Sequence, residues 1–146
     1  MQLDETIAQY IVGLRHVGVV CDDLDATLKR LQQLFSITDS DIVRIPANNE
    51  PCDTRFAFFE IAGLRYELIQ PVSAEYIEKM AGTNRGANHV CYTVRDLPGA
   101  IEAMKKLGVR TGHVTADGMV ETASFRMAYF HPQDTAGLLI EFVEDL

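Results

Sequence analysis

The chain is poor in three features, and each shortage argues against a class of protein. Its three cysteines, Cys21, Cys52 and Cys91, lack the spacing of a zinc finger, so we expect reduced thiols and no disulfide framework. Basic residues number 13 against 21 acidic ones, and the formal net charge of −8 argues against binding nucleic acid or an anionic membrane. No apolar run is long enough to span a bilayer, and no cationic start precedes a hydrophobic core, so we expect a cytoplasmic protein.

What the chain does contain is an ordinary globular composition and an internal repeat. With 146 residues, 47% of them hydrophobic, it suits a single domain over residues 1–146. Each half sets a histidine, His16 or His89, seven residues ahead of an Asp-Leu pair. Each half later carries a Gly-x-x-x-Glu pattern, which ends at Glu67 in the first and at Glu141 in the second. The sequence therefore predicts two similar modules with one His and one Glu each.

Hydrophobic periodicity assigns the same order of elements to both modules. In the first, at about 14–71, strands are predicted near 14–21, 41–46, 54–61 and 64–70. In the second, at about 87–144, strands are predicted near 87–95, 109–115, 124–130 and 137–143. A short helix around 75–80 is expected between them. The pattern predicts an α+β fold of two βαβββ modules related by pseudo-twofold symmetry.

A helix is expected after the first strand of each module. Asp22 or Asp23 can open the first helix, while Asp96 can cap the second, with Pro98 in its first turn. Apolar residues recur every three or four positions in both helices, which predicts that one face of each packs on a sheet. The expected inward residues are Leu24, Leu28, Leu31 and Phe35 in the first helix, and Leu97, Ile101, Met104 and Leu107 in the second.

The repeated histidines and glutamates form a ligand set for a divalent metal ion if symmetry brings them to one point. Two imidazoles and two carboxylates leave adjacent positions of a six-coordinate ion open to two substrate oxygens. Taken alone, either histidine could be a hydrogen-bonded core residue, and either glutamate could face water on an edge strand. The repetition favours one cobalt, nickel, zinc or manganese ion, with the ligands His16, Glu67, His89 and Glu141.

Three other reactive side chains are assigned no catalytic role. His131 precedes a proline and His113 follows a glycine, and neither has a repeated partner, so we expect both to be structural or exposed. Cys91 lies two residues after His89, and strand alternation puts it on the ligand face. We expect Cys91 to line that face rather than to act as a nucleophile, because no histidine is free to activate it.

The paired pattern resembles the vicinal oxygen chelate superfamily of glyoxalase-like metalloenzymes over essentially residues 14–144. Within it the chain is most similar to the methylmalonyl-CoA epimerase family, in residues 66–71 (Tyr-Glu-Leu-Ile-Gln-Pro), in 89–108 and especially in 130–141 (Phe-His-Pro-Gln-Asp-Thr-Ala-Gly-Leu-Leu-Ile-Glu). The resemblance implies a glyoxalase-like fold, a homodimer and an isomerase that abstracts a proton next to the carbonyl of methylmalonyl-CoA or a related acyl-CoA.

The resemblance also implies a catalytic base. In the superfamily a glutamate beside the metal takes the proton, and this role carries over to Glu141. Some epimerases of this kind are thought to use a second glutamate on the third strand of the first module, where the chain offers Glu60. If Ala62-Gly63 forms a two-residue hairpin, Phe58 faces Glu67, and Glu60 points inward, paired with Arg65.

Two other functions are compatible with the same scaffold. One is a lyase like glyoxalase I, which would act on a glutathione adduct of methylglyoxal to give lactoylglutathione. The other is a resistance-type protein that sequesters a ligand without catalysis, although the intact ligand set disfavours it. In each case the anionic part of the ligand needs a basic side chain, and the sequence does not rank the candidates Arg44, Arg55, Arg65, Arg85 and Arg126.

Overall fold

The computed structural model describes residues 6–81 and 83–146, which form two compact units. The first, called the His16 unit, is His16–Asn88, and the second, called the His89 unit, combines His89–Leu146 with residues 6–15. The chain passes from one unit to the other inside β1 (Ile11–Val20) and again inside β5 (Gly86–Val94). A single domain with modules at 14–71 and 87–144 stays a prediction. No helix within the described ranges could cross a membrane.

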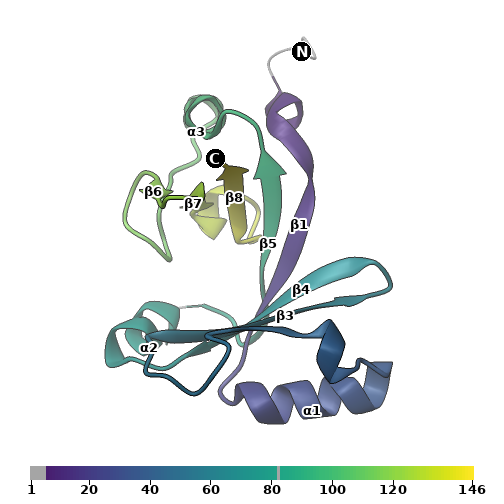
Figure 1. The fold of residues 1–146 in the computed structure, drawn as a ribbon. Coiled ribbons are helices and arrows are strands. Elements are labelled where there is room, and N and C mark those ends of the chain that lie inside the picture. The colour runs from purple at the N-terminus through teal and green to yellow at the C-terminus, as the bar shows by residue number, and fades with distance from the viewer. Residues whose placement is uncertain (1–5, 82) are drawn as a thin grey trace. The chain divides into compact units, whose positions relative to one another are not determined.

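The His16 unit is a four-stranded sheet covered on one face by a helix (Figure 1). Its strand order is β2-β3-β4-β1, in which β4 runs parallel to β1 and antiparallel to β3. After β1 the elements are α1 (Leu24–Phe35), β2 (Val43–Ile45), β3 (Thr54–Ile61), β4 (Leu64–Pro71) and α2 (Ala74–Ala81). The predicted strands and both predicted helices of this region are therefore confirmed.

Local chemistry explains where α1 begins and ends. The Asp23 side chain accepts a hydrogen bond from the Ala26 N–H at 3.0 Å, so Asp23 is the predicted cap. Leu24 and Leu28 are buried against the sheet as predicted. Phe35 is not buried as predicted: 51% of it is exposed, because it is the last residue of the helix. The chain turns at the left-handed residue that follows, and Ile37 occupies the core position instead.

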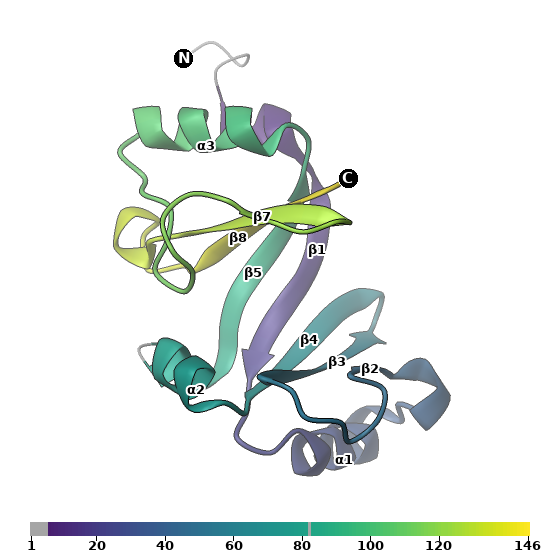
Figure 2. The ribbon, with the colours of Figure 1, turned by 60° about the vertical axis from the view of Figure 1, so that its left-hand side comes forward.

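The His89 unit repeats this arrangement with the strand order β5-β8-β7-β6. Strand β8 runs parallel to β5 and antiparallel to β7, as β4 does to β1 and β3. Figure 2 shows α3 lying over one side of β7 and β8. The elements after β5 are α3 (Leu97–Lys106), β6 (Val120–Glu121), β7 (Phe125–Phe130) and β8 (Ile140–Asp145), and the N-terminal turn Ile7–Tyr10 packs against α3.

Both helices are joined to a strand of their own unit by the same kind of hydrogen bond. The Leu24 N–H donates to the Gln70 side-chain oxygen at 2.9 Å, and the Leu97 N–H donates to the Glu144 carboxylate, also at 2.9 Å. Asp96 caps α3 through the Gly99 N–H, and a proline stands in the first turn, as predicted. In both units a side-chain oxygen from the last strand of the module thus accepts a hydrogen bond from the first helical N–H, and this side chain is neutral in the His16 unit and a carboxylate in the His89 unit.

Two predictions for the second helix and the strand after it are wrong. The region 109–115 forms no strand and makes only an isolated bridge from Thr111 to Phe130. The cause is local, because Gly112 and His113 adopt positive φ angles of 108° and 86°, which an extended strand cannot contain. Leu107 is 67% exposed since α3 ends before it, and the buried residues of α3 are Leu97, Ala100 and Met104.

Candidate active site

The His16 unit places a histidine and a glutamate together on the sheet face opposite α1. Parallel pairing of β1 with β4 sets Gly18 beside Glu67, and His16 is two residues before Gly18 on the same face. The His16 Nε2 atom lies 3.5 Å from Glu67 Oε1, and the two side chains are 7% and 12% exposed. Phe58 stands opposite Glu67 as predicted, with its ring edge-on to His16 at a centroid distance of 6.3 Å.

The His89 unit holds the equivalent pair in a more enclosed position. His89 Nε2 lies 3.1 Å from Glu141 Oε2, and the side chains are 0% and 9% exposed. Cys91 on β5 and Tyr129 on β7 stand on either side of Glu141, and the Tyr129 ring meets His89 edge-on at 5.3 Å. Cys91 is fully buried in an apolar cluster on this face, which agrees with a lining role.

The donor atoms of each pair are spaced as two ligands of one ion would be. Imidazole nitrogens and carboxylate oxygens bind zinc at about 2.0–2.2 Å, so two of them at a right angle are about 3 Å apart. The observed separations of 3.1 and 3.5 Å fit this geometry. A direct hydrogen bond between imidazole and carboxylate has a similar length. Each unit therefore offers one nitrogen and one oxygen donor that suit a divalent metal.

Glu60, the alternative base, is not placed as expected. It does stand opposite Arg65 in the β3–β4 hairpin, so the predicted register is confirmed. However, Glu60 is exposed, and among the residues that the structure describes it forms no ion pair with Arg65. The guanidinium of Arg65 instead lies over the Phe58 ring, with its central carbon 4.7 Å from the centroid. The position near the hairpin tip at Ala62-Gly63 explains the exposure of Glu60.

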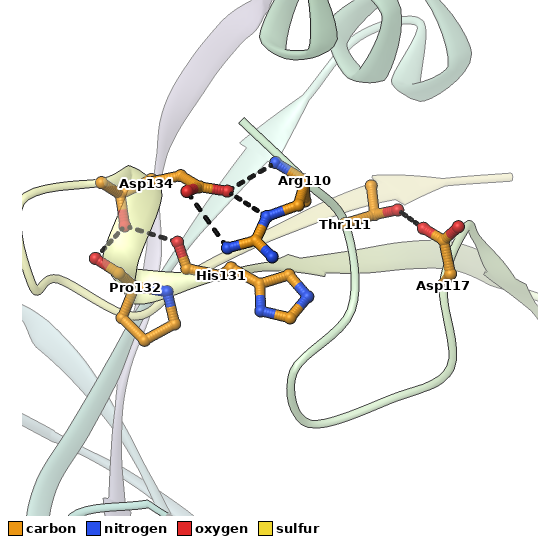
Figure 3. Close-up of polar contacts among 7 residues, drawn as sticks. Arg110, Thr111, Asp117, His131, Pro132 and Asp134 are labelled. Atoms are coloured by element: carbon orange, nitrogen blue, oxygen red, sulfur yellow. Dashed lines mark hydrogen bonds and ion pairs between the residues drawn. The ribbon is translucent and has the colours of Figure 1, made fainter. Parts of the chain in front are cut away.

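The remaining two histidines, His113 and His131, lie outside the strands of the His89 unit, and Figure 3 shows His131 beside Arg110 and Asp134. The His131 carbonyl accepts a hydrogen bond from the Asp134 N–H, and the Asp134 carboxylate binds the Arg110 guanidinium at 2.8 Å. His113 is exposed, and its ring meets that of His131 edge-on at 5.7 Å. Some loss of hydration, and then the neighbouring His131, lower the pKa of His113. The arrangement agrees with the expected structural or exposed positions of both.

One aromatic neighbour of the candidate site did not follow from the sequence. Phe58 could be placed because a two-residue hairpin fixes the register of β3 against β4. Tyr129 could not, because residues 131–139 separate β7 from β8 and include a short 3-10 turn. The internal repeat is the sequence feature that could have indicated Tyr129, since an aromatic residue faces the glutamate in both units.

Comparison with known proteins agrees with this architecture. Residues 15–129 match the family model of the Glyoxalase/Bleomycin resistance protein/Dioxygenase superfamily, and the chain belongs to this family. The structure of methylmalonyl-CoA epimerase from Mycobacterium tuberculosis superposes with a TM-score of 0.66 at 21% identity, over 94% of this chain and 91% of that chain. The Streptomyces coelicolor methylmalonyl-CoA epimerase in complex with 2-nitronate-propionyl-CoA gives 0.68 at 22% identity, over 92% and 97%. The predicted glyoxalase-like fold is confirmed.

The chain is also similar in sequence to proteins that are named as acyl-CoA epimerases. Mouse mitochondrial methylmalonyl-CoA epimerase is 23% identical over 147 aligned positions, which cover 96% of this chain and 78% of the mouse protein. The ethylmalonyl-CoA/methylmalonyl-CoA epimerase of Cereibacter sphaeroides is 24% identical over 135 positions, covering 88% of this chain and 94% of the bacterial protein. The resemblance predicted from the sequence is therefore confirmed at the level of the family and its epimerase members.

Proposed function

We propose that the protein is an isomerase that epimerises methylmalonyl-CoA or a related branched acyl-CoA. The observation that carries the proposal is the repeated His–Glu pair, which each unit holds largely buried on the sheet face opposite its helix. Relatives named as acyl-CoA epimerases support the expected isomerase over a lyase. The reaction would remove the proton next to the thioester carbonyl and return a proton on the opposite face.

We further propose that the two pairs together hold one divalent metal ion. His16 and Glu67 would supply one nitrogen and one oxygen, and His89 and Glu141 the other two donors. Imidazole and carboxylate suit cobalt, nickel, zinc and manganese, and the donor set does not select among them. When bound, such an ion stabilises negative charge on a carbonyl oxygen, which eases loss of the neighbouring proton.

Glu141 is the residue that we assign as the base. Its carboxylate is 9% exposed and lies against His89, in a face otherwise lined by apolar side chains and Tyr129. Once it has loosened from the metal, a carboxylate in such a dry position can take a proton from carbon more readily than one in water, where hydration stabilises its charge. The buried position supports Glu141 over the exposed Glu60.

Deuterium exchange tests the proposed reaction. The metal-loaded protein is incubated in deuterated water with (2R)- or (2S)-methylmalonyl-CoA, and deuterium at the α-carbon is measured together with the stereochemistry of the product. We expect exchange and interconversion from both starting isomers. Formation of lactoylglutathione from the hemithioacetal of methylglyoxal and glutathione, without exchange of either acyl-CoA isomer, would establish the lyase instead. Ligand binding without either reaction would favour the sequestering protein.

A homodimer stays a prediction that the family resemblance implies. Both outermost strands in the two orders are short, three residues for β2 and two for β6, which limits unintended pairing of strand edges. From the family resemblance, sedimentation velocity at micromolar concentration should show one defined species of twice the chain mass. Sedimentation as a monomer alone would contradict the expectation.

A further inference from the structure

The five arginines that the sequence left unranked differ in what their guanidinium groups contact. Three of them are paired with a carboxylate, and a fourth donates to the side-chain oxygen of an asparagine. These contacts are Arg44 with Asp25 at 2.7 Å, Arg85 with Asp22 at 3.3 Å, Arg126 with Glu144 at 2.8 Å and Arg55 with Asn49 at 3.3 Å. An anion that bound to any of the first three would have to compete with a carboxylate that is already in place.

Arg65 differs from the other four because its contact is an aromatic ring. Its guanidinium carbon is 4.7 Å from the centroid of Phe58, within the range of a cation–π interaction. Within residues 6–81 and 83–146 it forms no ion pair and no side-chain hydrogen bond. The ring orients the guanidinium while leaving its N–H groups available to a ligand.

Arg65 also lies on the face that carries the His16–Glu67 pair. It is two residues before Glu67 on β4, and alternate residues of a strand point to the same face. Phe58, which stands opposite Glu67, contacts both the His16 ring and the Arg65 guanidinium. By contrast, Arg44 stands opposite the buried Ala57 and therefore belongs to the face that α1 covers.

The surface around Arg65 is hollowed. A cavity of about 520 Å³ lies at this end of the hairpin, and residues of both sheet faces line it: Phe58, Glu60, Arg65 and Val43 on the side of the His16–Glu67 pair, and Phe59, Ile37 and Phe35 on the side of α1. Cavities of about 300–1,000 Å³ are typical of small-molecule sites. The hollow combines aromatic and apolar walls with the carboxylates of Asp41 and Glu60 and with one cation, Arg65, which forms no ion pair or side-chain hydrogen bond within the described ranges.

We propose that Arg65 is the residue that recognises the anionic oxygens of the substrate, and this inference rests on the proposed acyl-CoA epimerase function. The ligand group is a carboxylate or a phosphate, either of which a guanidinium can bind through two parallel hydrogen bonds. Two positions along a strand span about 7 Å, so the anion would bind close to the reacting end of the substrate. The free carboxylate of the acyl group is therefore the favoured source, and a phosphate of coenzyme A is the other.

The test compares wild-type protein and Arg65→Gln in calorimetric titrations with two ligands. Propionyl-CoA carries the phosphates but no free carboxylate, whereas methylmalonyl-pantetheine carries the carboxylate but no phosphate. We expect Arg65→Gln to bind methylmalonyl-pantetheine about 10-fold to 100-fold more weakly, as is typical when a charged hydrogen bond is lost. Binding of propionyl-CoA should change less than 2-fold. Weakened binding of propionyl-CoA alone would instead assign the phosphate to Arg65.

Two variants control the experiment. Arg55→Gln removes a guanidinium from the same hairpin, at the position opposite Gln70, and should bind both ligands like the wild type. Arg65→Lys keeps the charge but not the paired hydrogen bonds, so its affinity should lie between those of wild type and Arg65→Gln. Because Arg65 is exposed, we expect the thermal unfolding of both Arg65 variants to match the wild type.

The outcomes separate this inference from the proposed function. In one outcome, wild-type protein exchanges the α-proton of methylmalonyl-CoA, and Arg65→Gln binds both ligands and turns over the substrate as well as wild type does. This outcome would refute the role of Arg65 and leave the epimerase function standing. If wild-type protein neither binds these ligands nor exchanges the proton, the epimerase function is refuted and the assignment to Arg65 with it. A raised KM with a nearly unchanged kcat in Arg65→Gln would support recognition by Arg65.

Discussion

Both units place a histidine next to a glutamate, but the pair of the His89 unit is closer together and more deeply buried. In the His89 unit the nitrogen–oxygen distance is 3.1 Å, against 3.5 Å in the His16 unit, and the histidine side chain is 0% rather than 7% exposed. The difference originates in the strand that faces the glutamate. Four successive residues of β7, from Met127 to Phe130, are buried, whereas β3 buries only Ala57 and Phe59, on the side of α1. One scaffold thus provides a closed half, which suits proton transfer, and an open half, which suits substrate recognition.

The largest expected effect concerns Glu141, the proposed base in the closed half. Glu141→Gln keeps the shape and one oxygen donor but removes the basic group, so α-proton exchange should fall by about 100-fold to 10,000-fold. Elemental analysis should still find metal in this variant. Glu60→Gln, on the exposed hairpin of the open half, should exchange nearly as fast as wild type. Loss of exchange in Glu60→Gln, with near-normal exchange in Glu141→Gln, would reverse the assignment.

Metal binding should depend on both halves. His16→Ala and His89→Ala each remove one proposed ligand, and we expect the affinity for the ion to fall at least about 10-fold in either variant while the fold is retained. Metal content by elemental analysis and far-ultraviolet circular dichroism measure the two properties. A wild-type protein that holds less than about a tenth of an equivalent of any divalent metal, and gains none when supplied, would refute the shared site.

The cores of the two units can be compared by one truncation in each. Leu28 of α1 is 1% exposed and Leu97 of α3 is 0% exposed, so both changes to alanine leave a cavity. We expect each to lower the free energy of unfolding by about 2–5 kcal/mol, measured by chemical denaturation. Exposed Leu34, on the outer side of α1, provides the control, since Leu34→Ala should have a much smaller effect. Equal losses in all three variants would contradict the assigned core.

The smallest expected effect concerns the hydrogen bond at the start of each helix. Arg126 and the Leu97 N–H lower the pKa of Glu144 below its ordinary value of 4.5. A lowered folded-state pKa stabilises the fold above pH 4.5, and this contribution is lost as the pH falls through the lower folded-state value. The His16 unit uses the neutral Gln70 at the equivalent place.

Replacing Glu144 by glutamine makes the His89 unit resemble the His16 unit in this respect. Glu144→Gln should therefore be less stable than wild type at pH 7 and should lose less stability on acidification below pH 4.5. Thermal unfolding followed by circular dichroism across pH 3–7 measures both differences. Parallel curves for the two proteins would show that Glu144 makes no pH-dependent contribution.

What could be predicted from the sequence is largely what short-range chemistry determines. The aspartate caps of α1 and α3 act within three residues, and the two-residue turn fixes Phe58 against Glu67, so these were predictable. The region 109–115 was not, because positive φ angles at Gly112 and His113 override its apolar pattern. The ranking of the arginines also required the fold, since the partner of Arg126 is 18 residues away and that of Arg44 is 19.

The N-terminal segment has a consequence for the order of events during synthesis. Residues 6–15 belong to the His89 unit, where the Tyr10 carbonyl accepts a hydrogen bond from the Arg95 N–H at 2.9 Å and Ile7 packs against α3. At roughly 5–20 residues per second, a ribosome needs roughly 4–17 s after Tyr10 to reach Arg95. The contiguous His16 unit is synthesised in this interval and leaves the ribosome before Arg95, so we expect it to begin folding while residues 6–15 still lack their partners.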